Sequence, residues 1–200
     1  MAANKAYVQI AQGDIWIGGT PPAAGIDLTD PTTSALNTMQ TGFTGPTSGG
    51  TAVGFTNGPS TFIFKPTYYL VESEQAFAEI MVVPTAEEAT LDFIMLEASY
   101  FNLNRSMGRA TSHIGAGFNA NHGGGLNTVS TFLLVLNARK TVQVGYYILS
   151  IYQSYSFDGV SLNFERRKEM VNKVMMRALA DTNRPVGDQL YQLVEYTANP

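Results

Sequence analysis

The chain has 200 residues, of which 44% are hydrophobic and only 14% charged, with a formal net charge of −4 and no cysteine. This length suffices for one sizeable hydrophobic core and does not require a second domain. The acidic balance argues against a protein that binds nucleic acid by neutralising phosphates, and the lack of cysteine excludes disulfides and thiolate metal sites.

The first 19 residues hold a single Lys, and Asp14 interrupts their apolar positions, so they do not predict a secretory signal. No window approaches 18 uninterrupted apolar residues, and we expect no membrane span. A surface with so few charges suits a protein that buries much of its outside against copies of itself. It equally suits an ordinary β-protein with a polar, uncharged surface.

The first 60 residues predict little regular structure. A strand is expected at residues 7–10 or 14–17, where Trp16, the only tryptophan, would anchor a core or an interface. Residues 41–60 hold six Gly and two Pro and predict a long loop, with a short strand or hairpin arm at 51–55. This loop is either a flexible surface segment or an arm that becomes ordered only against a neighbouring subunit.

Residues 61–108 are the part around which we expect the fold to be built. Apolar runs predict strands at 61–64, 69–71, 80–83 and 91–95, with Pro66 and Pro84 as stops. Residues 96–107 carry apolar side chains at intervals of four, three and four, the pattern of an amphipathic helix. Glu97 would lie in its first turn and Arg105 near its end, with Gly108 as the left-handed cap.

The second half alternates between a Gly-rich loop and β-type sequence. Residues 109–127 predict a loop, residues 131–137, 142–152 and 190–196 strands, and residues 156–159 a turn. Residues 160–164 also alternate as a strand does. Residues 165–179 are ambiguous, because their composition favours a helix while their apolar positions also alternate. Residues 181–188 predict a turn-rich connector.

Together these elements predict an α+β fold in a single domain, residues 1–200. It would be dominated by an antiparallel β-sandwich or barrel, with one α-helix at about 96–107 and long Gly-rich loops.

We expect no enzymatic activity and no cofactor or metal site. His113 and His122 lie nine apart in a Gly-rich loop, too far for a compact metal site without further ligands. Glu87 and Glu88 are adjacent, so in a strand they would point to opposite faces, and in a loop they would be solvated. The glycines near the histidines lack the strand–turn–helix setting of a phosphate loop, and no nucleophile elbow is present.

Two sets of short segments resemble the tail tube (major tail) proteins of long-tailed bacteriophages. The first is Glu72-Ser73-Glu74-Gln75, then Glu87-Glu88-Ala89-Thr90-Leu91, then Leu96-Glu97-Ala98 with Asn102-Leu103 and Gly108; the second is Ala178-Leu179-Ala180-Asp181 with Arg184-Pro185 and Gly187-Asp188. The resemblance implies a strand from about residue 170 in the ambiguous segment.

The resemblance also implies a virion protein, made in the host cytoplasm, that forms stacked hexameric rings. In that family each subunit lends strands to a closed β-barrel around the channel. The rings surround a tape-measure protein, tail-end or terminator proteins bound the tube, and double-stranded DNA passes through the lumen without specific binding. The alternatives are another virion component, such as a capsid decoration protein or a contractile-tail tube protein, and a carbohydrate-binding β-module.

Two groups of residues follow as candidates from this interpretation. Because a basic lining would bind phosphates, we expect an acidic or neutral lumen, with Glu72, Glu74 and Glu79 as lumen-facing candidates. In the long loop, the candidates for an arm that stacks one ring on the next are Gly45, Gly49, Gly50, Phe55 and Asn57. Lys173 and Arg177 are expected to point outward or to pair with carboxylates.

Overall fold

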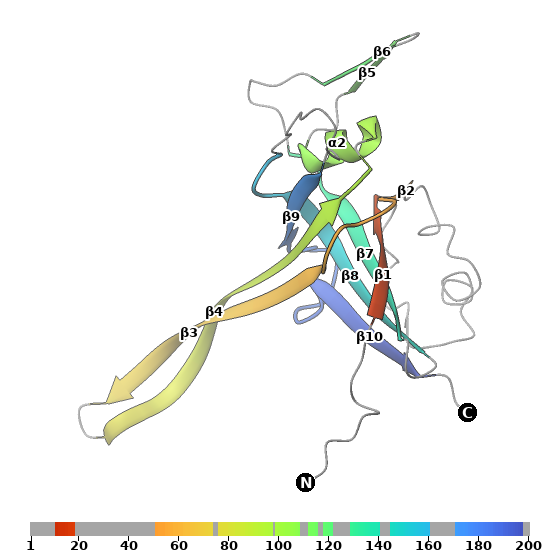
Figure 1. Cartoon of the computed structure of the whole chain (residues 1–200). Helices are drawn as coiled ribbons and strands as arrows, with labels where there is room; N and C mark the ends of the chain where they lie inside the picture. The colour runs from red at the N-terminus through yellow and green to blue at the C-terminus, as the bar shows by residue number, and fades with distance from the viewer. Residues whose placement is uncertain are drawn as a thin grey trace.

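The computed structural model describes residues 11–18, 51–73, 76–97, 99–108, 112–115, 118–121, 129–140, 145–160 and 171–197. Within these ranges the chain is mainly antiparallel β-sheet with one short helix, a β-rich α+β fold (Figure 1). The elements are β1 (Ala11–Ile17), β2 (Thr51–Ala52), β3 (Thr61–Ser73), β4 (Ala76–Met95), α2 (Tyr100–Ser106), β5 (Ser112–Gly115), β6 (Phe118–Asn121), β7 (Phe132–Lys140), β8 (Gly145–Ser156), β9 (Asn172–Leu179) and β10 (Tyr191–Thr197).

The main sheet places strands from both ends of the chain side by side. Over the described ranges it has eight strands in the order β2-β1-β7-β8-β9-β4-β3, with β10 also pairing with β8. One edge of β8 is divided between two strands, because β10 pairs with residues 145–151 and β9 with residues 153–156. The connector between β9 and β10 therefore leaves the sheet where these two strands diverge.

Most of the core lies on one face of this sheet. On β9 the buried positions alternate, with Asn172, Val174, Met176 and Ala178 inside and Lys173 exposed, as period-two patterning requires. A second, smaller cluster of Leu133, Val135, Ile148 and Val194 has formed on positions that alternate with those of the first. The main cluster comprises Ile15, Ile17, Val53, Ala89, Leu91, Phe93, Met95, Leu134, Leu149, Ile151, Val174, Met176 and Ala178.

The helix is shorter than predicted, seven residues rather than residues 96–107. Ser99 caps it by accepting a hydrogen bond from the backbone N–H of Asn102, at 3.3 Å, so the helix begins after Glu97 and not around it. The expected ending is confirmed, since Arg105 lies in the last turn and Gly108 has a left-handed φ of 68°. No described helix is long or apolar enough to span a bilayer.

The two prolines do not stop the strands, which corrects the prediction of several short strands at residues 61–95. β3 continues through Pro66 to Ser73, and β4 continues through Pro84 to Met95. Proline is tolerated on an edge strand, where the missing N–H would only face solvent. β3 is the edge of the sheet, and β4 pairs with β9 only at residues 90–95, so at Pro84 it too has a free side within the described structure.

The second half mostly follows the predictions. The ambiguous segment is a strand from Asn172, and the strand at 190–196 and the turn before Gly159 are confirmed. The loop predicted at 109–127 instead contains the small hairpin β5–β6. The strand predicted at 160–164 lies almost wholly outside the described residues.

Part of the glycine-rich loop is ordered against its own chain. β2 pairs with β1, Val53 is fully buried, and the N–H groups of Val53 and Asn57 donate to Ile15 and Ile94 at 2.9 Å. Residues 51–60 thus contact their own chain, and the role of Phe55 and Asn57 in stacking stays a prediction. The rest of that loop, with Gly45, Gly49 and Gly50, lies outside the described residues.

Candidate functional site

The β3–β4 hairpin projects far beyond the rest of the sheet (Figure 1). Residues 76–89 of β4 have β3 as their only strand partner among the described residues, because the pairing of β4 with β9 begins at Thr90. Their partners on β3 are residues 64–73, so at about 3.4 Å per residue this free part of the ribbon is roughly 34 Å long. A two-stranded ribbon of this kind is only marginally stable in water by itself.

A β-bulge bends the ribbon near its middle. Thr67 pairs with Ala86 but Tyr68 pairs with Pro84, so Thr85 is an extra residue on β4. Its hydroxyl donates to the carbonyl oxygen of Thr67 at 3.2 Å, which ties the bulged residue to the opposite strand. Bulges bend a strand and increase its twist, so this one sets the direction of the outer half of the hairpin.

An apolar stripe runs from the core along one face of the hairpin. On β3 it consists of the alternating residues Phe62, Phe64, Pro66, Tyr68 and Leu70, which share a face because side chains repeat every two residues. Phe62 is partly buried against the core, and its ring lies 5.0 Å from that of Tyr191. Toward the tip of the hairpin the stripe becomes exposed, and Tyr68 is 53% exposed. The core-facing surface of the sheet thus continues onto a ribbon that no described residue covers.

The opposite face of the hairpin is also apolar. Tyr69 pairs with Val83 and Val71 with Met81, and Tyr69 and Met81 are 63% and 59% exposed. Contiguous apolar surface of this kind marks an interaction site in most monomeric proteins. Both faces of the outer hairpin therefore have the character of a surface that is buried in an assembly.

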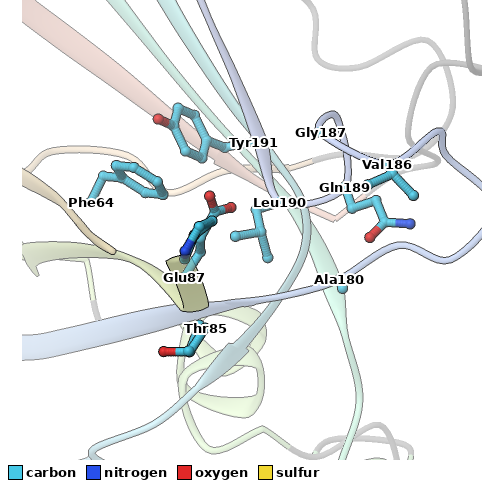
Figure 2. A pocket seen from close by; sticks show the side chains of 11 residues that line it. Phe64, Thr85, Glu87, Ala180, Val186, Gly187, Gln189, Leu190 and Tyr191 are labelled. Atoms are coloured by element: carbon cyan, nitrogen blue, oxygen red, sulfur yellow. The ribbon is translucent and has the colours of Figure 1, made fainter. Parts of the chain in front are cut away.

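A groove of about 630 Å³ lies at the base of the hairpin (Figure 2). One wall is the free side of β4 around Thr85 and Glu87, and the other is the connector between β9 and β10, with Leu190 between them. Val186 on the connector is 95% exposed, which is unusual for a valine. The full lining is Phe64, Pro84, Thr85, Ala86, Glu87, Ala180, Val186, Gly187, Gln189, Leu190 and Tyr191.

A buried polar cluster holds this connector in place. The guanidinium of Arg184 lies 3.4 Å from the ring centroid of Tyr152, and it forms ion pairs with Asp181 at 3.5 Å and Asp188 at 3.3 Å. The Tyr152 hydroxyl donates to Asp188 at 2.7 Å. Burial, and then this hydrogen bond, raise the pKa of Tyr152 well above its ordinary value, so the hydroxyl keeps its proton. From the sequence, Tyr152 was expected only at the end of a strand, and Asp181, Arg184 and Asp188 only in a turn-rich connector and in the tail tube resemblance.

The predicted lumen residues lie at the outer end of the hairpin. Glu72 and Glu79 occupy opposite positions in the β3–β4 register, and Glu74 lies outside the described residues. Arg177 pairs with Glu88 at 3.2 Å, as expected, and Lys173 is exposed.

The other predicted residues are distributed over separate places. Phe55 is exposed, and its N–H donates to a Glu97 carboxylate oxygen at 3.2 Å. His113 lies in β5, and His122 falls outside the described residues. Within the described ranges no three His, Cys, Asp or Glu side chains gather as metal ligands would.

Neither a scan against models of known protein families nor a search of curated proteins found a match to this chain. The hairpin and the sequence are therefore the features that bear on the function of this protein.

Proposed function

We propose that this chain is a structural virion protein that assembles with itself, the tail tube subunit of a long-tailed bacteriophage. The observation that carries this proposal is the β3–β4 hairpin, with large apolar side chains exposed on both faces. A long two-stranded ribbon is only marginally stable alone, and a subunit that buries it against its neighbour gains stability from it. The sequence resemblance to tail tube proteins points the same way.

In more detail, we propose that the subunit folds as a β-sandwich or barrel, which is closed by strands of neighbouring subunits. The ring contact between Phe62 on β3 and Tyr191 on β10 supports a sheet that curls on itself. Joining free strands of successive subunits around a channel would remove the exposed edges that β-proteins otherwise have to protect. Stacked hexameric rings would then surround a tape-measure protein, with terminator proteins at the tube end.

The acidic end of the hairpin fits a channel that conducts DNA. We predict that carboxylates outnumber Lys and Arg on the lumen face, with Glu72, Glu74 and Glu79 contributing. Replacing all three with lysine should slow DNA delivery by assembled particles, because a basic lining binds phosphates. Unimpaired delivery by such particles would contradict this assignment.

The glycine-rich arm is the second assembly element that we propose. Deleting residues 45–50 should leave the subunit folded and block the stacking of rings, because the deletion spares Val53 and the hydrogen bonds of residues 53–57. Circular dichroism and thermal unfolding would check the fold, and electron microscopy the stacking. Normal tubes from the deleted protein would remove the arm from the stacking contact.

Electron microscopy tests the main proposal directly. Purified protein at increasing concentration, alone and with its tail partners, should form rings or tubes in negative stain. Gold-labelled antibody should bind along the tail of phage particles. Label on the head instead would indicate a capsid decoration protein, and a protein absent from tails that never polymerises would refute the proposal.

A carbohydrate-binding module is the second candidate. The observation that favours it is a groove of about 480 Å³ beside the exposed ring of Phe55, with Asp14 in its wall. Aromatic rings and carboxylates in open grooves are typical of sugar sites. A glycan array with a Phe55→Ala control decides between the two, since a tube subunit should bind no glycan.

A further inference from the structure

Within the described structure, the guanidinium of Arg105 is a cation with no carboxylate partner. Arg105 lies in the last turn of α2 and is partly buried, and its Nη1 is buried with no hydrogen-bond partner. None of the ion pairs among the described residues involves it. Burial lowers the pKa of Arg105, whereas a carboxylate at its side would raise that pKa.

The dipole of α2 offsets this burial only in part. A cation near the C-terminus of a helix is favoured, but the effect is weak and confined to the last turn. A charge that is taken out of water needs a partner of opposite sign to offset the loss of hydration. A buried polar atom without a partner therefore indicates a contact still to be made.

The guanidinium lies where the chain leaves the described ranges. It rests against the backbone of Gly18, since a methyl group at position 18 would lie 3.1 Å from Nη2 of Arg105. The N–H of Gly18 donates to the carbonyl oxygen of Leu133 at 2.8 Å, which fixes this point. The chain returns at Thr51, which pairs with Ile17. Both ends of residues 19–50 are therefore held beside Arg105.

Residues 19–50 carry charges of one sign only. They hold two acidic residues, Asp27 and Asp30, and no Lys or Arg. We propose that Arg105, seated against Gly18, binds a carboxylate of its own chain, supplied by Asp27 or Asp30. The ion pair would attach the first part of this segment to the end of α2. This inference does not rest on the tail tube assignment.

The short tether favours this pairing. Asp27 lies nine residues after Gly18, and Asp30 lies twelve after it. Nine residues reach at most about 30 Å, and a flexible stretch of that length spans about 15–18 Å on average. A carboxylate tethered at this distance has an effective concentration on the order of millimolar. The planar fork of a guanidinium can then hold both of its oxygens.

Glu169 is the rival supplier of the carboxylate. It lies three residues before Asn172, whose side chain donates to Ser106, the neighbour of Arg105, at 3.2 Å. However, Glu169 directly follows three basic residues, 166–168, which offer it cations nearer in the sequence. The aspartates of the segment 19–50 have no such local cation, so they are the better partners.

A double-mutant cycle tests the pair. Arg105→Met keeps a long side chain that suits a helix, and the variant Asp27→Asn, Asp30→Asn removes both carboxylates. In the wild type, Arg105→Met should raise the equilibrium constant for unfolding about fivefold or more, because an ion pair is lost. In the Asp27→Asn, Asp30→Asn background the change should be less than about twofold, because there the cation is already unpaired. The helix dipole acts in both backgrounds and cancels.

Glu169→Gln provides the matched control for this cycle. In that background Arg105→Met should keep its full effect of about fivefold or more, because the proposed carboxylates are intact. Urea denaturation measures all of these unfolding constants.

Cross-linking provides a second readout, which does not depend on stability. The chain has no cysteine, so the variant Phe101→Cys, Thr29→Cys carries the only two thiols and keeps Arg105 and both aspartates. Phe101 is 55% exposed and lies one helical turn before Arg105, on the same face of α2. A short bismaleimide should join the two cysteines within one chain. Adding Arg105→Met should slow this cross-linking about threefold or more, because the segment is then held less closely.

The opposite results would overturn the inference. Equal effects of Arg105→Met in the wild type and in the Asp27→Asn, Asp30→Asn background would show that no pair forms. Loss of the effect in the Glu169→Gln background alone would assign the carboxylate to Glu169 instead. Cross-links that form only between two chains would refute the assignment to the same copy. None of these outcomes bears on the tail tube proposal, which electron microscopy tests separately.

Discussion

Removing the Tyr152 hydroxyl tests how strongly its hydrogen bond to Asp188 stabilises the connector between β9 and β10, which forms one wall of the groove. Tyr152→Phe keeps the buried ring under Arg184 and removes only the hydrogen bond to Asp188, which is 2.7 Å long. A hydrogen bond to a charged group contributes about 1.5–3 kcal/mol. Asp188 keeps its ion pair with Arg184, and its side chain is 41% exposed, so water replaces part of the loss. We expect the free energy of unfolding to fall by about 1.5 kcal/mol.

Tyr147 on the same strand gives a matched control. Its hydroxyl also donates to a carboxylate, that of Glu195, but at 3.3 Å and in an exposed position. Tyr147→Phe should therefore cost less than about 0.5 kcal/mol, because an exposed bond is replaced by water. Urea denaturation of the wild type and of both variants measures the comparison. Equal losses in the two variants, or no loss in Tyr152→Phe, would refute the reasoning.

Wild-type protein and Tyr152→Phe should also differ in how their stability depends on pH. The pKa of Tyr152 is raised in the folded protein by burial and by its hydrogen bond to Asp188, whereas the unfolded chain ionises near pH 10. Above that pH the folded state binds more protons than the unfolded state, so stability falls as the pH rises. Wild-type protein should lose more stability between about pH 9 and pH 10.5 than Tyr152→Phe does.

Two further pairs of substitutions test the segment between β2 and β3 and the packing of the core. Gly54→Ala should destabilise the protein more than Gly58→Ala, because both have a left-handed φ but only at Gly54 would the new methyl group displace the Glu97 carboxylate, which accepts a hydrogen bond from the Phe55 N–H. Equal unfolding midpoints for these two variants would contradict that account. Met176→Ala should cost about 2–5 kcal/mol in urea denaturation, since the side chain is fully buried in the main cluster. Met175→Ala, at an outward position on the same strand, should cost clearly less, and the reverse order would show that the β9 faces are misassigned.

The strands with strong alternation were predictable from sequence because burial imposes that pattern directly. β9 is the clearest case. Its composition favours a helix, but Val174, Met176 and Ala178 alternate with outward residues, and the segment is a strand. Propensity is a weak preference, and the pairing of β9 with both β4 and β8 outweighs it.

The length of the hairpin was not predictable from sequence by local rules. Pro66 and Pro84 break strands only where a neighbour needs their N–H group, and a single sequence does not show which strand is an edge. Likewise, Glu97 precedes the helix because Ser99 is the better cap, and both residues suit a helix start.

The candidate site was predicted in part. The acidic residues of the outer hairpin were singled out, but the groove was missed, because its walls lie about 100 residues apart in the sequence. The aspartates and the arginine of the connector were noted only as part of a resemblance. Their spacing at 181, 184 and 188 was the available signal, since side chains three and four apart in a tight turn can meet.

The pairing of β1 with β7 sets the timing of folding. Ile15 pairs with Leu136, about 120 residues later, so this part of the sheet closes a very long loop. At about 5–20 residues per second, a ribosome delivers that partner roughly 6–24 s after β1. The β3–β4 hairpin joins neighbouring segments and can form within microseconds of its synthesis. During those seconds the hairpin is only marginally stable, because β9, which pairs with its base, has not yet been made; its strands meet early but become firmly ordered late.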